Sequence, residues 1–471
     1  MASFNDLLDK HWLDANHNIT LTLTYTIDPS AYSIIQYPQS FASDIVQADP
    51  ILARNALNTW ANVANIKFTP VSDSPDIGIF SAILNLGSKG KTIAYPTLIP
   101  PFDSIFLAGT FINKDTTNPG TFGSQQEVFD TYIHELGHAL GLDHPLHGEG
   151  DAPGYNKSMT VMSYAPARVT TDAGGATTNI AQGVITPMIL DIAAVQSMYG
   201  VNTTHNAGNT VYEISTSDVV AQDTVGNTVT TEVYQNLAPT SSGVAMTLWD
   251  ASANGAATDE FKVADGVNTD VHIDLRAGFL NSNDVDGEVG GYVSAGVSAP
   301  QQFYTQVGNT YVFLPYVNTG RGVIENATGG GGNDHIYGND VGNVLEGGGG
   351  NDTISGNGGN DTLEGGAGND TYEFAASGDG NDTISDSDDS GNIVIGGAVF
   401  SGTATKDGEG FYHLDTDNAT LAYNPTDHTL QILAWSGKTD QSTITLQNFH
   451  SGDLDLIKNK LNTKIDFCRA A

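Results

Sequence analysis

The feature that most constrains the fold of this chain is a nine-residue repeat that begins at Gly329. Five successive units read GGGGNDHIY, GNDVGNVLE, GGGGNDTIS, GNGGNDTLE and GGAGNDTYE, and SGDGNDTIS follows after a slip of three residues. One apolar residue per unit keeps a constant frame, namely Ile336, Leu345, Ile354, Leu363 and Tyr372. A carboxylate keeps another, namely Asp334, Asp352, Asp361, Asp370 and, after the slip, Asp382, whereas Asn343 replaces it in the second unit. Each unit therefore predicts a glycine-rich turn followed by a very short strand with one inward side chain.

Two such units make one coil of a parallel β-roll, so equivalent turns lie 18 residues apart, as Asp334, Asp352 and Asp370 do. One apolar residue per unit cannot offset the entropy of ordering the chain, and stacked carboxylates repel one another. Calcium solves both problems by binding carboxylates and turn carbonyls, and this pattern is that of calcium-binding RTX repeats. The alternative, a flexible glycine-rich linker, does not account for two fixed frames. The predicted calcium ligands are the side chains of Asp334, Asp352, Asp361, Asp370 and Asp382 and the turn backbone of Gly330, Gly332, Gly348, Gly350, Gly359, Gly366 and Gly368.

A histidine-rich stretch, TYIHELGHALGLDHP, covers residues 131–145. On a helix, His134 and His138 lie about one turn apart and project from the same face. Gly141 can take the left-handed conformation that ends a helix, so that His144 returns to the same metal. Three neutral imidazoles leave a fourth position for water, which predicts a catalytic zinc site with Glu135 as general base. The bland alternative is an ordinary amphipathic helix rich in histidine.

The spacing of these residues matches the longer H-E-x-x-H-x-x-G-x-x-H signature of metzincins. Such a site also needs a methionine turn downstream, and TVMSY at residues 160–164 supplies Met162 and Tyr164. By itself Met162 would be a core residue and Tyr164 a packed ring. After the zinc motif, we expect Met162 to be the methionine of this turn and the Tyr164 hydroxyl to reach the metal or the developing oxyanion. His147 competes with His144 for the third ligand position, but its spacing from Gly141 fits less well.

The net charge of −37 argues against a surface that binds nucleic acid or an anionic membrane, because both require clustered Lys and Arg. The sole cysteine, Cys468, excludes an intrachain disulfide. The first residues, MASFNDLLDKHW, lack a basic segment followed by an apolar run, and no apolar run has the ~20 residues of a membrane span. We therefore expect a soluble chain without a conventional signal peptide and without a membrane span.

Apolar periodicity predicts an α+β first half with a mixed twisted sheet and long helices. We expect strands at 19–27, 66–71 and 76–80 and helices at 52–63, 128–140 and 187–200, then an all-β parallel β-roll or β-sandwich half. The strands KTIAYP and DSIFLAG are candidates for a cleft edge that pairs with an extended peptide. The predicted division is a catalytic domain at 1–200 with an N-terminal extension at 1–17, a connecting β-rich part at 201–328, the RTX roll at 329–385 and a C-terminal β-rich part at 386–471.

Taken together, these motifs resemble those of serralysin-type metalloproteases, which are metzincins with an RTX β-roll. The resemblance extends to ALNTWANVANIKFTPVSD, VMSY, DIAAVQSMYG and VIENATGG. It implies one catalytic zinc ion on His134, His138 and His144, with Glu135 as general base. It also implies Met162 as the base of the site, Tyr164 as a mobile tyrosine ligand that stabilises the transition state, and several structural calcium ions.

The resemblance further implies a bacterial endopeptidase that acts on extracellular proteins and peptides. It would be a monomer, leave the cell through a type I secretion apparatus that reads a C-terminal signal, and meet a proteinaceous inhibitor. The ending KIDFCRAA, the short segment before the first strand and the stretch after Asp250 depart from the family pattern. Two alternatives are a calcium-dependent surface or binding protein with a degenerate protease domain and a polysaccharide-modifying enzyme with the same repeats.

Overall fold

The fold was analysed in a computed structural model. The residues that it describes are 11–12, 20–31, 42–84, 89–96, 104–113, 124–145, 155–170, 177–181, 183–216, 219–223, 228–230, 243–252, 257–276, 304–314, 323–375, 378–387, 390–400, 404–406, 412–414, 420–424, 428–432 and 443–447. None of the helices among these residues is both long and apolar enough to cross a membrane. His147 and the ending KIDFCRAA lie outside the described residues.

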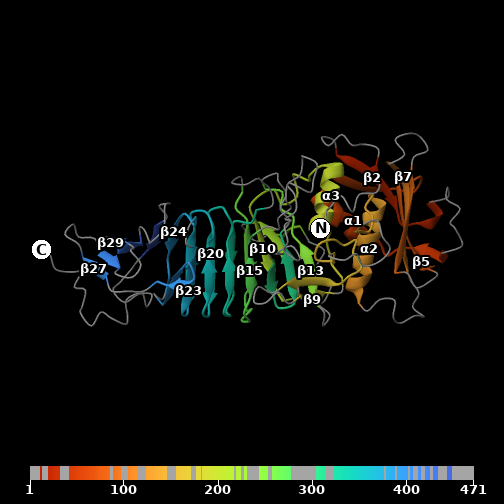
Figure 1. The fold of residues 1–471 in the computed structure, drawn as a ribbon. Coiled ribbons are helices and arrows are strands. Elements are labelled where there is room, and N and C mark those ends of the chain that lie inside the picture. Colours follow the sequence, from red (N-terminus) through yellow and green to blue (C-terminus); the bar gives the residue numbers. More distant parts are fainter. Residues whose placement is uncertain are drawn as a thin grey trace.

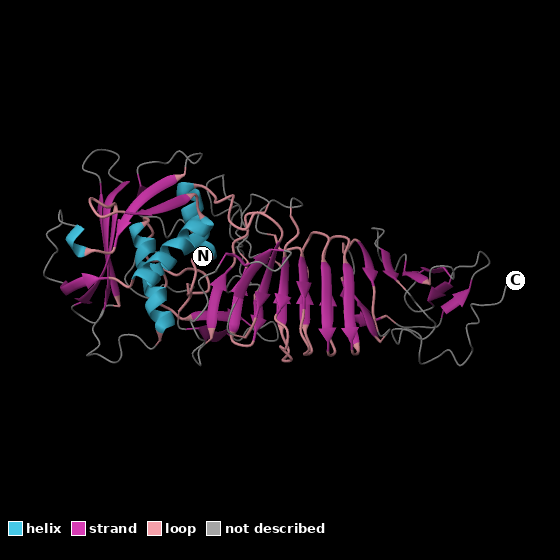
Figure 2. Cartoon of the chain, turned by 180° about the vertical axis from the view of Figure 1, so that it is seen from behind, coloured by secondary structure: helices cyan, strands magenta, loops and turns pink. Residues whose placement is uncertain are grey.

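The molecule is elongated, with its helices and a mixed sheet at one end and a stack of short strands leading to the other (Figure 1). Seen from behind, the strands of the stack run side by side between the helical end and the C-terminus (Figure 2). The structure is mostly β with few helices, and the stack agrees with the β-roll predicted from the repeats.

The sheet at the helical end has the strand order β1-β7-β5-β2-β4, with β3 paired to β5 and β6 paired to β7. Its strands are β1 (His11–Trp12), β2 (Leu21–Thr26), β3 (Ala42–Gln47), β4 (Ile66–Pro70), β5 (Ile77–Leu84), β6 (Gly90–Pro96) and β7 (Ser104–Asn113), and a 3-10 turn covers Pro29–Ala31. Parallel pairing of β2 with β4 around the intervening helix confirms the predicted strand-helix-strand unit. The antiparallel β6 makes the sheet mixed.

Side chains of β2, within the strand expected at 19–27, alternate only partly between buried and exposed. Leu21 and Leu23 are buried and Thr22 is exposed, but Tyr25 is half-buried and Thr26 is buried. Thr26 pairs with Gly78 of β5, and its hydroxyl accepts a hydrogen bond from the backbone N–H of Asp28. Neighbouring chain therefore covers the polar face at this end of the strand.

Three helices pack near this sheet: α1 (Pro50–Val63), α2 (Gln125–Ala139) and α3 (Ile189–Tyr199). The Asp49 side chain caps α1, and Ser124 caps α2 through the backbone N–H of Glu127, so α2 begins three residues before the predicted start. Helix α3 begins two residues after the predicted start at 187, and its C-cap is Gly200, which has φ +82. The indole N–H of Trp60 in α1 donates to the carbonyl of Ile133 in α2 at 3.2 Å, which fixes the spacing of these two helices.

The second half consists of two long sheets. The 13-stranded sheet contains β10 (Thr210–Ile214), β11 (Val219–Asp223), β12 (Thr228–Thr230), β14 (Glu260–Val263), β18 (Asn326–Thr328), β20 (Val344–Gly349), β22 (Thr362–Ala367), β24 (Asn381–Ile384), β27 (Ala404–Lys406), β28 (Tyr412–Leu414), β29 (Thr420–Asn424), β30 (Thr429–Ile432) and β31 (Thr443–Leu446). The nine-stranded sheet contains β13 (Val244–Thr247), β15 (His272–Asp274), β16 (Thr305–Val307), β17 (Thr310–Phe313), β19 (His335–Tyr337), β21 (Thr353–Ser355), β23 (Asp370–Phe374), β25 (Gly391–Ile395) and β26 (Ala398–Val399). A small hairpin, β8 (Ala167–Thr170) with β9 (Thr177–Ala181), completes the described strands.

The register of the roll is the predicted 18 residues. Ile336 pairs with Ile354 in one sheet and Leu345 pairs with Leu363 in the other, all in parallel strands. These side chains are fully buried between the sheets. The ladder does not begin at the first repeat, because Ile273 of β15 pairs with Ile336. Earlier strands therefore act as a template on which the first repeat unit stacks.

The repeat carboxylates stack in the turns. The backbone N–H of Asp334 donates to Oδ1 of Asp352 at 2.7 Å, and that of Asp352 donates to Oδ1 of Asp370 at 2.8 Å. On the other side, the N–H of Asp361 donates to Oδ1 of Asp382 at 3.0 Å, so the three-residue slip is absorbed before Asp382. The stacking of turns that contains Asp361 and Asp382 therefore continues across the slip of three residues.

Buried carboxyl oxygens at these turns fit a cation. The Oδ2 atoms of Asp352 and Asp361 are buried without a hydrogen-bond partner among the described residues. Burial, reinforced by the charges of Asp334 and Asp370, raises the pKa of Asp352 to about 7. In contrast, Asn343 donates from its amide to the carbonyl of Glu325 at 2.6 Å, so its turn is satisfied without a charge. Calcium binds oxygen ligands, and these two carboxyl oxygens receive no hydrogen bond that would compete with the ion.

The helical end and the roll share one continuous hydrophobic core. Val184 forms a bridge with Ala245, and the Thr247 hydroxyl donates to the carbonyl of Pro187 at 2.5 Å. Ala64, at the end of α1, forms another bridge with Val201. The predicted boundary at residue 201 therefore falls on a well-packed junction, and the domain division stays a prediction.

Chelation of calcium with EGTA should unfold the roll, because the stacked carboxylates would then repel one another. Circular dichroism should lose β signal, and calcium but not magnesium should restore it, since magnesium demands a smaller octahedral site. Asp352→Asn should lower the thermal midpoint in calcium. Asp265→Asn is the matched control, since the Asp265 side chain is 98% exposed. Equal midpoints with and without calcium would contradict calcium binding at these turns.

Candidate metal centre

Helix α2 carries the first two predicted ligands on one face. His134 and Glu135 are buried, with 6% and 5% of their surface exposed, and His138 is half-buried. Trp60 donates a hydrogen bond to the Ile133 carbonyl of this helix, and Ser124 caps its N-terminus. The alternative of an exposed amphipathic surface is wrong for His134, because this side chain points into the protein.

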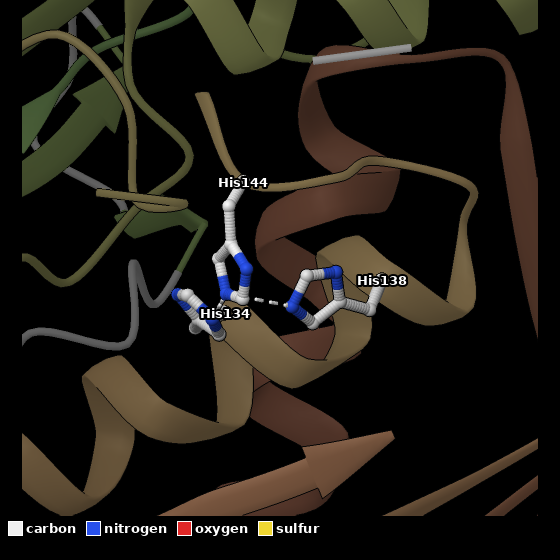
Figure 3. A group of neighbouring side chains, drawn as sticks. All are labelled: His134, His138 and His144. Atoms are coloured by element: carbon white, nitrogen blue, oxygen red, sulfur yellow. Dashed lines mark hydrogen bonds between the residues drawn. The ribbon is translucent and has the colours of Figure 1, made fainter. Parts of the chain in front are cut away.

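The third histidine returns to the same place through a glycine turn. Gly141 has φ +100, and the backbone N–H of Leu142 donates to the carbonyl of Gly137 at 2.9 Å. The Nε2 atom of His144 lies 3.2 Å from Nε2 of His134 and 3.2 Å from Nε2 of His138. Figure 3 shows the three rings pointing toward one another. Gly141 thus has the conformation predicted for it.

The three imidazoles fit zinc. Nitrogen ligands at ~2.0–2.1 Å in a tetrahedron lie about 3.3–3.4 Å apart, close to the observed separations. Burial, helped by the neighbouring rings, lowers the pKa of His138 to about 4 and lowers the pKa of His134 well below its usual value. Neutral imidazoles are the form that binds metal. Their Nδ1 atoms donate to backbone carbonyls, at 2.9 Å to Val161 for His134 and at 2.7 Å to Leu142 for His138, which leaves both Nε2 atoms as donors to a metal.

Glu135 lies beside the ligands and beneath strand β6. Burial raises the pKa of its carboxyl to about 7, and its Oε2 atom has no hydrogen-bond partner within the described parts of the chain. The hydroxyl of Thr92 donates to the Glu135 carbonyl at 2.8 Å. A Cβ atom at Gly90 would lie 2.5 Å from Cγ of Glu135, so only glycine leaves room for this carboxylate. Strand β6 therefore helps to place the predicted base.

Tyr164 reaches the centre from the methionine turn (residues 160–164). Its side chain is 52% exposed, and its hydroxyl lies 2.7 Å from Nε2 of His144. Its ring stacks on His134 with centroids 5.5 Å apart. The hydroxyl of Tyr164 therefore lies close to the histidines, and part of its ring faces solvent.

The repeats match a known family. The RTX calcium-binding nonapeptide repeat family matches residues 319–340 and 337–372.

Curated relatives match between 60% and 71% of the chain. It is 31% identical to a serralysin of Proteus mirabilis over 62% of this chain and 54% of the relative. It is 30% identical to metalloprotease AprA of Pseudomonas entomophila over 71% of this chain and 62% of the relative. It is 32% identical to serralysin A of Dickeya chrysanthemi over 60% and 51%, respectively. The chain is a homologue of the serralysin-type metalloproteases. It spans between half and two thirds of the length of these relatives.

In this serralysin homologue, Met162 packs against helix α2 at Gly137. Met162 is fully buried. A Cβ atom at Gly137 would lie 2.6 Å from Sδ of Met162 and 3.2 Å from Trp60. The missing side chain at Gly137 therefore lets Met162 of the methionine turn pack against α2.

Sequence reasoning missed three buried charged residues of the centre. Asp130 accepts hydrogen bonds from Lys157 and from the backbone N–H of Val184, which joins α2 to the loop before the methionine turn. Burial raises the pKa of Asp130, although Lys157 opposes the rise. Asp191 in α3 bonds to the methionine turn. A detectable signal existed, because Asp191 is a lone acid within the apolar run PMILDIAAV.

Replacing Gly137 with Ala should destabilise the protein and weaken metal binding. Alanine normally favours a helix by about 1 kcal/mol over glycine. Here the methyl group would collide with Met162, and overpacking of a core costs about 1–3 kcal/mol. Gly208→Ala is the control, because a Cβ atom there meets nothing within 4 Å. Thermal unfolding and zinc titration measure both effects, and a Gly137→Ala variant more stable than wild type would contradict the close contact.

Proposed function

We propose that this chain is a secreted zinc-dependent endopeptidase that hydrolyses peptide bonds of extracellular proteins. The observation that carries the proposal is the convergence of three Nε2 atoms, from His134, His138 and His144, beside the buried carboxylate of Glu135. Three protein ligands with an open fourth position are typical of catalytic rather than structural zinc. The serralysin relatives and the mixed sheet with its helices support a metzincin catalytic domain.

Each residue has a role in this reaction. Zinc, when bound, supplies Lewis-acid activation of the peptide carbonyl and of the attacking water. Glu135 accepts the proton of that water and then delivers it to the leaving amine. Tyr164 donates its hydroxyl proton in a hydrogen bond to the oxyanion that develops on the substrate carbonyl. Met162 supports the ligands from below, and Gly141 returns His144 to them.

Strand β6 is the proposed edge for an extended peptide substrate. It pairs with β7 on one side, and no described strand pairs with its other side. β7 lies inside the sheet between β5 and β6, so of the two candidate strands KTIAYP rather than DSIFLAG is available to a peptide. Gly90 and Thr92 of the same strand adjoin Glu135, which would place a paired peptide next to the base.

Calcium-dependent folding of the roll supports the proposed action outside the cell. Its RTX repeats indicate calcium binding, and we propose several structural calcium ions at the turns of Asp334, Asp352, Asp361, Asp370 and Asp382. The acidic roll would stay unfolded at low calcium and fold in calcium-rich surroundings outside the cell. Export by a type I apparatus, control by a proteinaceous inhibitor, a monomeric state and the division into domains at residues 200, 328 and 385 complete the proposal.

Glu135→Gln should abolish cleavage of casein and leave zinc content and folding intact. General-base catalysis contributes about 10²- to 10⁴-fold to the rate. Glu127→Gln is the matched control, because Glu127 lies on the same helix and pairs with Lys89 away from the histidines. Cleavage by Glu135→Gln at the wild-type rate would overturn the role of Glu135. Zinc binding by a wild-type protein without any peptidase activity would favour the binding-protein alternative.

Tyr164→Phe should lower kcat by about 10²-fold or more while changing zinc affinity little, since an oxyanion donor acts mainly in the transition state. The ring is retained, so its stacking on His134 is preserved. Steady-state kinetics with a peptide substrate, combined with zinc titration, separates the two effects. A loss confined to zinc affinity would show that Tyr164 acts only as a ligand partner.

A further inference from the structure

His134 and His138 are oriented by different parts of the chain. The partner of His138 is Leu142, in the turn that ends its own helix. The partner of His134 is the carbonyl of Val161, which lies 27 residues along the chain in the methionine turn. The carbonyl accepts from Nδ1, which fixes the tautomer and directs the Nε2 lone pair away from it. The orientation of His134 therefore depends on what holds the peptide between Val161 and Met162.

That peptide is linked to Asp191 by a continuous chain of hydrogen bonds. Its N–H, on Met162, donates to the hydroxyl oxygen of Thr160 at 3.1 Å. The Thr160 hydroxyl in turn donates to Oδ1 of Asp191 at 2.6 Å. Hydrogen bonds in such a chain polarise one another in a low-dielectric interior. Asp191, Thr160 and Met162 are all fully buried, so solvent does not compete for these contacts.

The position of Asp191 in α3 does not by itself explain these contacts. Its Oδ2 atom accepts from the backbone N–H of Met188 at 2.8 Å, which is ordinary capping of the helix. The same atom also accepts from the N–H of Val161 at 2.7 Å, and Oδ1 is used by Thr160. Two of the three hydrogen bonds thus go to the methionine turn. A buried carboxylate is costly, and an uncharged amide oxygen could also have accepted the capping hydrogen bond.

We propose that Asp191 is a positioning residue of the metal centre, which acts through Thr160 and the Val161–Met162 peptide to orient and polarise His134. The inference rests on the proposed zinc site. Asp191 touches neither the metal position nor a substrate, and its effect reaches the metal through the basicity and the aim of one imidazole. Partners of this kind contribute about 10- to 100-fold to metal affinity.

The test measures zinc affinity by competition with a chromophoric chelator, together with the visible absorption band of the cobalt-substituted full chain. Thr160→Val breaks the chain of hydrogen bonds and leaves the Asp191 contacts with Val161 and Met188 in place. It should weaken zinc binding about 10-fold or more and shift the cobalt band. Thr160→Ser retains the hydroxyl and should restore both readouts. Asp191→Ala should reduce affinity up to about 100-fold, and Asp191→Asn by less, because an amide oxygen can still accept.

Gln196→Ala is the control for a lost hydrogen bond on α3, since Gln196 donates to Val63 at 2.7 Å and lies away from the methionine turn. It should lower the thermal midpoint and leave zinc affinity and the cobalt band unchanged. Wild-type zinc affinity and cobalt band in Thr160→Val would overturn the proposal, even if Asp191→Ala fails to fold. Wild-type zinc binding without peptidase activity would overturn the proposed function alone, whereas a wild-type chain without zinc affinity would overturn both.

Discussion

The centre depends on one packing contact, between helix α2 and the methionine turn. Gly137 removes the side chain that would separate the helix from Met162, and Trp60 closes the same contact from α1. Once the turn lies against the helix, the Val161 carbonyl reaches His134. The same approach places the Tyr164 hydroxyl beside His144. The geometry of the ligands thus depends on the close approach of the Met162 side chain to α2, for which Gly137 leaves room.

Buried carboxylates near the metal centre differ in whether the protein supplies their hydrogen-bond partners. Asp130 meets Lys157, Asp191 meets three donors, and Glu135 retains an oxygen without a hydrogen-bond partner among the described residues. The first two are satisfied within the protein and hold segments together. Glu135 is left partly unsatisfied next to the ligands, as a group that must exchange protons with a substrate would be. The same distinction applies in the roll, where Asn343 is satisfied and Asp352 is not.

The two ends of the molecule are coupled through packing rather than through a flexible connection. Thr247 donates to the carbonyl of Pro187, immediately before the N-cap of α3, and α3 carries Asp191. The strands that precede the repeats join the same ladder as the repeats, since Ile273 pairs with Ile336. Order in the roll can therefore support the helix that holds the methionine turn, although the two sites lie far apart along the molecule.

Short-range spacing in the sequence determined the register of the roll and the convergence of the histidines. The nine-residue frame predicted the 18-residue register, and the spacing of His134, His138, Gly141 and His144 predicted their convergence, because helix geometry and repeat geometry act over short distances. Only the tertiary structure decided the tasks of Gly137, Gly90 and Asp191, which depend on segments tens of residues away. It also decided that Thr26 is buried and that β6 rather than β7 is the edge strand. Contacts between distant segments leave no period in a sequence, and for that reason the partners of Gly137, Gly90 and Asp191 could be found only in the folded chain.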